Sequence, residues 1–345
     1  MELNERKQRI LNAVIQDYIM SAEPVGSRTI ARKYDLGVSA ATIRNEMFDL
    51  ELMGYLEQPH TSAGRTPSAK GYRFYVDCLL QPSEITKDDR RLIRAWLNDK
   101  MDDVDQIFQS TAKVLSKMTH NVTLVIASRQ LGAKLKYIRF MPLDDRRAIM
   151  LIVADTGQVE NSIYNKPVDV DVDELNILAE KLTYCLAGTP LEKITTDLLD
   201  RFRNDVVGDL DLYRTAFRSL HRAFRKQQLY QGGTMELLNV PEFRNVDKAR
   251  SLFGILEERE KVFDLLSNDD EEDENPVVVR IGDEHSPVPL NDCSIIEATF
   301  RGNDEVLGKI AVLGPTRMEY AKIIGLLDFM KEHMIQVLAH YHDDK

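Results

Sequence analysis

"SAATIRNEMFDLELMGYLEQPHTSAGRTPSAKGYR", residues 39–73, is the stretch that decides the fold of the first part of the chain. Its first half places Ile43, Met47 and Leu50 on one face of a helix, with polar residues between them. Ser39 is suited to cap the start of this helix, and Gly54 to end it. Because the second half is polar and rich in glycine, the stretch predicts a helix that passes directly into an irregular loop.

Two further helices are predicted before this one. Residues 5–20, "ERKQRILNAVIQDYIM", carry apolar side chains at helical spacing, and Pro24 and Gly26 break that helix. Ser27 is suited to begin a short second helix, which ends near Gly37. A helix, a break, a short helix, a glycine turn and a longer helix form the helix-turn-helix layout. In that layout the last of these helices enters the major groove of DNA.

The loop after the third helix predicts a wing. Residues 55–60, "YLEQPH", predict a short extended run, and Thr66-Pro67 opens the next helix. We expect Arg65 at the tip of the loop between them, beside a glycine that permits close backbone approach. The sequence suggests no internal partner for Arg65. Its guanidinium group is therefore expected to project and to enter a narrow minor groove.

The candidate DNA contacts come from the second helix, the third helix and the loop. Arg44 can offer paired donors to guanine or can touch phosphate alone, and Asn45 can pair with adenine. The small residues that begin the third helix let its backbone approach the groove, and the remaining residues suit phosphate contacts. The candidate DNA-contacting residues are Arg28, Arg32, Lys33, Ser39, Ala41, Thr42, Arg44, Asn45, His60, Thr61, Ser62 and Arg65.

The charge distribution permits DNA binding at this end of the chain. The formal net charge of the 345 residues is −11. Residues 1–75 hold 10 Lys and Arg against 9 Asp and Glu, whereas the rest of the chain holds 35 against 47. The acidity therefore lies outside the first 75 residues, and the distribution of charge decides where an anionic partner is accepted.

The whole pattern predicts an α+β protein of several domains. Short apolar strands occur before residue 165 and resume after residue 276, which indicates one α+β domain interrupted by an insertion. The expected parts are a winged helix-turn-helix domain at 1–82, a linker helix at 83–103, an α+β domain at 104–188 and 276–345, and a mainly helical insertion at 189–275. The acidic run "NDDEEDEN" within the insertion is expected to be a solvated loop.

A dimer interface is expected in the insertion. Its helices carry apolar stripes that include Phe217, Leu220 and Phe224. A segment that interrupts a compact domain needs a function, and a two-fold interface supplies one. The predicted assembly is therefore a homodimer.

Several classes of protein are disfavoured by what the sequence lacks. The longest apolar run, "AIMLIVA" at 148–154, is too short to span a bilayer, and the charged N-terminus does not resemble a signal peptide. We therefore expect a cytoplasmic protein. Three scattered cysteines form neither a zinc motif nor a disulfide framework. The common phosphate-binding and hydrolase motifs are absent, so neither an enzyme nor a bound cofactor is expected.

The combination of "SAATIRNEM" and "HTSAGRTPSAKGYR", together with "YQGGTMELLNVPEF" at 230–243, resembles the HrcA family of bacterial heat-inducible transcription repressors. The resemblance covers essentially the whole chain. It implies a winged-helix domain, a GAF-like domain and an inserted dimerisation domain. It also implies repression of class I heat-shock chaperone operons through the inverted-repeat CIRCE operator, with activity modulated by the chaperonin GroEL.

Two other functions are weighed beside this one. A metabolite-sensing winged-helix regulator would bind a small ligand in its GAF-like domain, although no cluster of residues identifies such a ligand. A nucleic-acid enzyme would need a metal-binding carboxylate cluster, which the sequence does not show. A thermal-shift screen distinguishes the sensor, because a ligand that binds only the native state raises the melting temperature.

Overall fold

The computed structural model describes residues 3–61, 63–81, 83–97, 104–128, 133–191, 194, 227–266, 277–285, 290, 292–302 and 305–343. Contacts divide the chain into two compact units. The first comprises Met1–Ile126 with Leu229–Ile335, and the second comprises Ala127–Gln228 with Gln336–Lys345. Within the described residues, no helix is long and apolar enough to cross a membrane.

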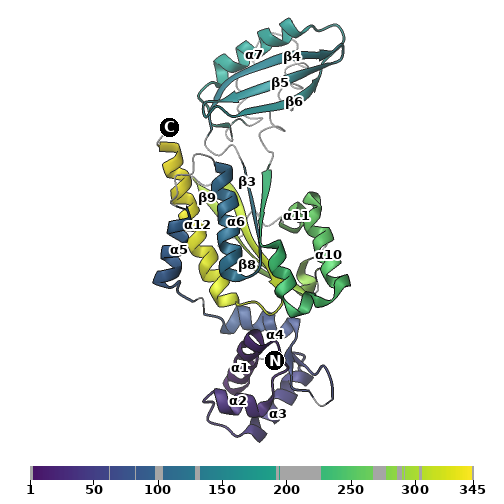
Figure 1. The fold of residues 1–345 in the computed structure, drawn as a ribbon, viewed down its shortest axis with the longest axis vertical. Helices are drawn as coiled ribbons and strands as arrows, with labels where there is room; N and C mark the ends of the chain where they lie inside the picture. The colour runs from purple at the N-terminus through teal and green to yellow at the C-terminus, as the bar shows by residue number, and fades with distance from the viewer. Residues whose placement is uncertain are drawn as a thin grey trace. The chain divides into compact units, whose positions relative to one another are not determined.

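The first unit begins with a small helical segment, residues 3–81, which we call the head (purple and blue in Figure 1). Three helices are followed by a two-stranded antiparallel ribbon and a fourth helix. The elements are α1 (Glu5–Ser21), α2 (Ser27–Lys33), α3 (Ala40–Leu52), β1 (Leu56–Glu57), β2 (Thr66–Pro67), α4 (Ala69–Phe74) and the π-helical turn η1 (Tyr75–Leu79).

The inward faces of the first three helices form the core of the head. Ile10, Ile30, Ile43 and Leu50 are all fully buried. Ser39 caps α3, because its hydroxyl accepts a hydrogen bond from the Thr42 amide at 3.2 Å. The three helices predicted from residues 5–54 are thereby confirmed, with the inward face of α3 as expected.

The rest of the first unit, which we call the body, is built on a five-stranded sheet of order β7-β3-β10-β9-β8. The strands are β3 (Val122–Ser128), β7 (Gln227–Gly232), β8 (Val277–Ile281), β9 (Cys293–Gly302) and β10 (Glu305–Pro315). The helices are α5 (Lys87–Leu97), α6 (Val104–Thr119), α10 (Val246–Glu257), α11 (Arg259–Leu266) and α12 (Tyr320–Asp343), with short 3-10 turns at η3 (Thr234–Asn239), η4 (Pro241–Arg244) and η5 (Gly282–His285).

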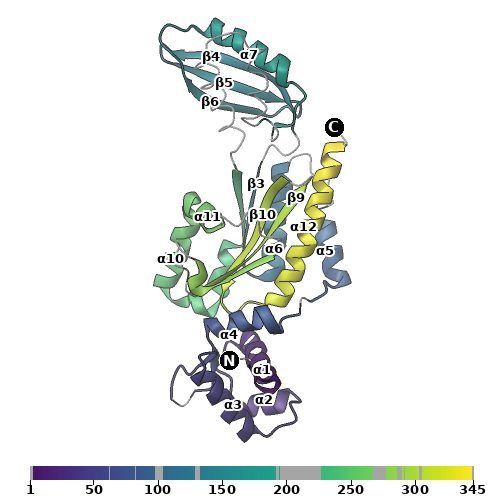
Figure 2. The same ribbon diagram turned by 180° about the vertical axis from the view of Figure 1, so that it is seen from behind.

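Helices cover both faces of this sheet. On one face, Phe108 of α6 lies against Phe300 of β9, with ring centroids 6.2 Å apart. On the other face, Leu252 of α10 and Val262 of α11 share a buried cluster with Leu124 of the sheet. Helix α6 accordingly lies in front of the sheet in Figure 1 and behind it in Figure 2.

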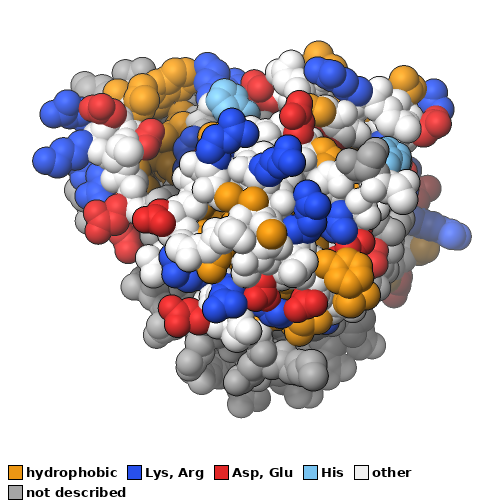
Figure 3. Space-filling model, turned by 90° about the horizontal axis from the view of Figure 1, so that it is seen from below, with side chains coloured by type: hydrophobic (Ala, Val, Ile, Leu, Met, Phe, Trp, Pro, Cys, Tyr) orange, Lys and Arg blue, Asp and Glu red, His pale blue; other side chains and the backbone are white. Residues whose placement is uncertain are grey.

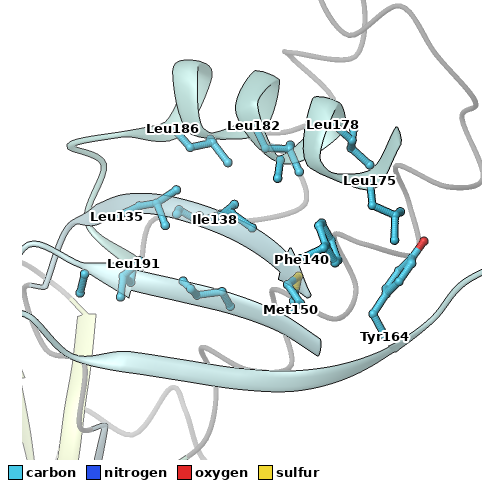
Figure 4. Packing of buried hydrophobic residues seen from close by; sticks show 14 of the residues in the cluster. Leu135, Ile138, Phe140, Met150, Tyr164, Leu175, Leu178, Leu182, Leu186 and Leu191 are labelled. Carbon is cyan, nitrogen blue, oxygen red and sulfur yellow. The ribbon is translucent and has the colours of Figure 1, made fainter. Parts of the chain in front are cut away.

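The second unit, which we call the inserted unit, is a three-stranded antiparallel sheet with one helix on its face. Its elements are β4 (Leu135–Asp144), β5 (Arg147–Ala154), β6 (Val159–Asn165) and α7 (Val172–Leu186). Burial alternates along β5, and its buried side chains face α7. Figure 4 shows Leu178 and Leu182 of α7 directed at Ile138 and Phe140 of β4.

The division of the chain differs from the one expected from the sequence. The strands at 135–165 form a sheet of their own. Of the described strands before residue 165, only β3 lies in the same sheet as the strands after residue 276. Residues 229–266, expected in the insertion, belong to the body, because β7 pairs with β3 and α10 and α11 cover the sheet. The inserted unit therefore runs from 127 to 228 rather than from 189 to 275.

Some expectations fall on residues that the structure does not describe. They are the apolar stripe of Phe217, Leu220 and Phe224, the acidic run at 268–275, and the end of the linker helix after residue 97. The described part of that linker, α5, is attached to the body: Lys117 of α6 places its ammonium group 4.2 Å from the centre of the Trp96 ring.

Candidate nucleic-acid interface

The outer face of α3 is the surface that the helix-turn-helix layout assigns to DNA. Ala41, Arg44 and Asn45 are exposed on it, and Thr42 is half-buried beside the cap. Ser39 is exposed, and its hydroxyl lies 3.0 Å from that of Thr42 as well as capping the helix. Two of the candidate residues, Ser39 and Thr42, therefore shape the start of the helix in addition to being accessible.

Phe48 lies on the same exposed face and was missed in the sequence analysis. It follows Asn45 by three residues and Arg44 by four, so all three share one side of the helix. The side chains of Phe48 and Leu52 are both exposed. The signal was present in the sequence, since these apolar residues fall outside the buried face of Ile43, Met47 and Leu50.

All three carboxylates of α3 are paired inside the head. Asp49 and Glu46 both bind the ammonium group of Lys7 on α1, with 2.8 Å between Lys7 Nζ and Asp49 Oδ2. These hydrogen bonds raise the pKa of Lys7 above its usual value, and the bond to Asp49 has the larger effect. The third carboxylate, Glu51, binds Arg65. Each carboxylate of the helix therefore has a cationic partner, while Arg44 forms no ion pair with any described residue.

The basic residues of α2 differ from one another. Arg28 and Arg32 are exposed, and neither pairs with a carboxylate among the residues that the structure describes. Lys33 donates to the buried Asp17 of α1 at 2.5 Å, and this hydrogen bond raises the pKa of Lys33. Arg28 and Arg32 are therefore available to phosphate, whereas Lys33 also holds α2 against α1. Figure 3, seen from the head end, shows Lys and Arg side chains at many points of this face.

The loop between β1 and β2 forms a small turn. The side-chain amide of Gln58 donates to the carbonyl oxygens of Thr61 and Ala63, each at 3.1 Å, and the Ala63 amide donates to the His60 carbonyl at 2.8 Å. His60 and Thr61 are exposed at its tip. Ser62 lies outside the described residues. Among the described residues, the tip of the wing is thus formed by His60, Thr61 and Ala63, not by Arg65.

The expectation that Arg65 projects without a partner is wrong. Its Nε and Nη2 both donate to Glu51 Oε2, at 2.8 and 2.7 Å, and only 17% of its side chain is exposed. Its backbone forms a two-way bridge with Val25, with N···O distances of 2.8 and 2.9 Å. Arg65 therefore lies at the base of the wing and ties it to the segment before α2 and to α3.

A glycine is needed at position 64 for a reason different from the expected one. A Cβ atom at this position would lie 2.4 Å from the carbonyl oxygen of Val25 and 2.6 Å from that of Pro24. The glycine therefore permits the close approach of two protein strands that the Val25–Arg65 bridge requires. Access of DNA to the loop is not what this position demands.

Comparisons with known proteins identify the family of the chain. Residues 105–324 match a family described as HrcA protein C terminal domain. A heat-inducible transcription repressor HrcA of Pelotomaculum thermopropionicum is 40% identical over 343 residues, which cover 98% of this chain and 97% of the relative. One of Symbiobacterium thermophilum is 42% identical over 339 residues, covering 97% and 98%. The chain belongs to the HrcA family.

Membership of the HrcA family makes this chain a heat-inducible transcription repressor of heat-shock genes. The relatives are named as repressors, which fits a protein without enzymatic activity. A crystal structure described as that of a hypothetical protein superposes with a TM-score of 0.64 at 19% identity, covering 99% of this chain and all of the other. That likeness shows the fold alone.

Proposed function

We propose that this HrcA chain represses chaperone operons by binding the inverted-repeat CIRCE operator as a homodimer, with the head acting as a winged-helix domain. The observation that carries the proposal is the internal pairing of every carboxylate on α3, which leaves Arg44 as the charge on the outer face without an ion pair among the described residues. A helix of that kind fits the major groove, where Arg and Asn side chains read base edges.

The other contacts follow from the geometry of the head. With α3 in the groove, Arg28 and Arg32 at the exposed side of α2 are suited to flanking phosphates. The wing tip, His60 and Thr61, offers a second contact along the backbone. Ser39 and Thr42 lie at the start of α3, the end that reads base edges in this class of protein.

The homodimer has a candidate surface in the inserted unit, separate from the segment expected from the sequence. The face of the three-stranded sheet opposite α7 carries Tyr137, Met141, Val159 and Ile163, whose exposed fractions run from 43% to 59%. One apolar residue on a surface is ordinary, but four on the two outer strands of one sheet face, β4 and β6, mark an interaction site. We propose that two copies join through this face, and that the body corresponds to the GAF-like domain.

The test is a binding titration with three DNA duplexes: the full inverted repeat from a chaperone promoter, a single half-site, and a scrambled sequence. A two-fold dimer should bind the full repeat far more tightly than the half-site. Affinity should fall steeply with salt as Arg28, Arg32 and other cations release phosphate counterions. Equal affinity for all three duplexes at one salt concentration contradicts the proposal.

Modulation by GroEL is the remaining part of the proposal, and the family resemblance supports it. The chain diluted from denaturant should recover more operator binding with GroEL and ATP than without them. The control is a chaperonin blocked from releasing its substrate. Equal recovery in all three mixtures removes this partner from the proposal.

One observation favours the metabolite-sensing alternative. A pocket of about 350 Å³ is lined by residues of the head and body, including Ile19, Tyr34, Tyr75 and Tyr320. Its aromatic and apolar lining is typical of small-molecule sites. A thermal-shift screen of small aromatic metabolites, repeated with Tyr75→Ala, tests it. A shift in melting temperature that disappears in the variant supports the sensor. No shift with any compound means that none of the compounds tested is its ligand.

A further inference from the structure

Arg317, in the loop before α12, connects two segments that are distant in sequence. Its Nη1 donates to the carbonyl oxygen of Ile19, in the last turn of α1, at 3.2 Å. Its Nη2 donates to Glu242 Oε2 at 3.1 Å, and its Nε binds the other oxygen of the same carboxylate. Both carboxylate oxygens of Glu242, in the body, thus hold the guanidinium group of Arg317 while it donates to the head.

The point that Arg317 touches is the negative end of a helix. The last carbonyl groups of a helix lack intrahelical partners and carry partial negative charge, which a cation stabilises. The last turn of α1 contains no basic residue of its own. Arg317 therefore supplies from the body the cation that the sequence of α1 lacks.

A second arginine makes the same kind of connection in the opposite direction. Arg73, on α4 of the head, donates to the Val279 carbonyl at 2.7 Å and from Nε to Glu284 Oε1 at 2.9 Å. The head and the body also share an aromatic contact, in which the rings of Tyr72 and Tyr75 lie 5.9 and 6.4 Å from that of Tyr320. The head is consequently held by two charged contacts and one aromatic contact.

We propose that Arg317, held by Glu242, and Arg73, held by Glu284, are positioning residues that fix the orientation of the head on the body. We call these four residues the clamp. The inference rests on the proposed function, in which a dimer engages two half-sites at once. It also gives a role to the segment "YQGGTMELLNVPEF", because Glu242 is the residue of that segment that holds Arg317.

The clamp should determine affinity for the full operator and not for one half-site. Each α3 reads its half-site through residues of the head alone, so intrinsic recognition does not involve the clamp. Binding of the second head is intramolecular, and its effective concentration depends on how well the first binding event orients it. A head that moves relative to the body also loses more conformational entropy on binding than a head in a fixed orientation.

The experiment compares Arg317→Ala, Arg73→Ala and the double variant with the wild-type full chain, titrated against full operator and half-site at matched salt. Full-operator affinity should fall by roughly tenfold or more in the double variant, since linked sites gain about 10²–10⁴ in avidity. Half-site affinity should stay within about twofold. Arg317→Lys, which keeps a cation near Ile19 and Glu242, should recover part of the loss. An unchanged ratio of the two affinities overturns the proposal.

Two controls keep the outcome interpretable. Lys248→Ala removes an exposed ion pair of the body, 2.8 Å from Asp292, and should leave both affinities unchanged. Amide hydrogen exchange follows the segment that joins the head to the body, because the Ser83 amide, just after the head, donates to the Ala321 carbonyl at 3.2 Å. The peptide spanning residues 80–86 should exchange faster in the double variant, and unchanged exchange also overturns the clamp. If the wild type does not prefer operator to scrambled DNA, the proposed function is wrong and exchange alone decides the clamp.

Discussion

Glu51 on α3 binds both Nε and Nη2 of Arg65 through one carboxylate oxygen, and this pair joins the wing to the helix proposed to read DNA. The pair is partly screened, since 17% of the arginine and 26% of the carboxylate side chain are exposed. It nevertheless pairs the only acidic residue of α3 that Lys7 does not bind. The same contact therefore shapes the wing and adjusts the charge of the groove-facing helix.

Breaking this pair should destabilise the head modestly. Arg65→Ala is expected to lower the free energy of unfolding by about 1 kcal/mol. Solvent partly screens the pair, so the loss should be close to that measured for exposed ion pairs. Thermal and urea unfolding of the full chain measure the change. Arg250→Ala, which removes an exposed pair with Asp247 in the body, is the matched control and should have no measurable effect.

Glu51→Gln separates a structural role of Arg65 from contact with DNA. The substitution removes the charge that holds the guanidinium group while leaving Arg65 in place. If Arg65 contacts DNA, as the sequence led us to expect, the variant should bind the operator more tightly, since no internal pair must be broken first. Tighter binding that persists when Arg65 is also replaced by Ala would show that the gain comes from the lost carboxylate and not from Arg65.

Gly64→Ala should destabilise the wing much more than its chemistry suggests. A methyl group would meet the Val25 carbonyl oxygen at 2.4 Å, so the bridge between Val25 and Arg65 must open. We expect a loss of about 1–3 kcal/mol in stability, as for other overpacked sites. Operator affinity should fall as well, because the wing would move.

Gly254→Ala is the control for this substitution. Gly254 lies within α10, and a Cβ atom there meets nothing within 4 Å. Replacement should be neutral or should stabilise by about 0.5–1 kcal/mol, since alanine favours the helix. Equal effects of the two substitutions on unfolding would show that close approach at Gly64 does not matter.

The parts predicted correctly from the sequence are those whose signal is local. The buried face of α3 and the Ser39 cap depend on residues within one helix, and periodicity and capping chemistry reveal them. The partition of strands between two sheets depends on pairing between distant segments, such as β3 with β7, which periodicity does not encode. The sequence shows that β4 to β6 are strands but not that α7 covers them as a separate unit.

The error over Arg65 has the same physical origin. Its partner, Glu51, lies 14 residues earlier on a helix, and the fold alone brings the two together. Gly64 looked like a site of access for DNA because glycine permits any close approach. Only the position of the Pro24–Val25 backbone identifies what actually approaches.

Ile163→Lys tests the proposed dimer surface. Ile163 is 59% exposed on β6, so a monomer should fold normally with lysine there, whereas two facing copies would bury two like charges. Sedimentation should show a shift from dimer to monomer, and full-operator affinity should fall toward that of a half-site. Val246→Lys, at an exposed apolar site of the body, is the control. A fully dimeric Ile163→Lys protein places the interface elsewhere.

The last prediction concerns how α3 reads its operator. Arg44→Ala should weaken binding by about 1–3 kcal/mol, and the pattern of loss across operator variants reveals its partner. If Arg44 donates to a guanine, discrimination at one base pair should disappear, whereas a phosphate contact gives a similar loss on every sequence and lowers the salt slope by about one.

Asn45→Ala should relax the preference for adenine at a neighbouring position with little change in the salt slope, because it removes no charge. Phe48→Ala, on the same exposed face, reports whether this side of α3 meets an apolar group such as the thymine methyl. All three side chains are exposed, so stability should stay within about 0.5 kcal/mol of the wild type. Unchanged operator affinity in all three variants would mean that another face of the head binds DNA.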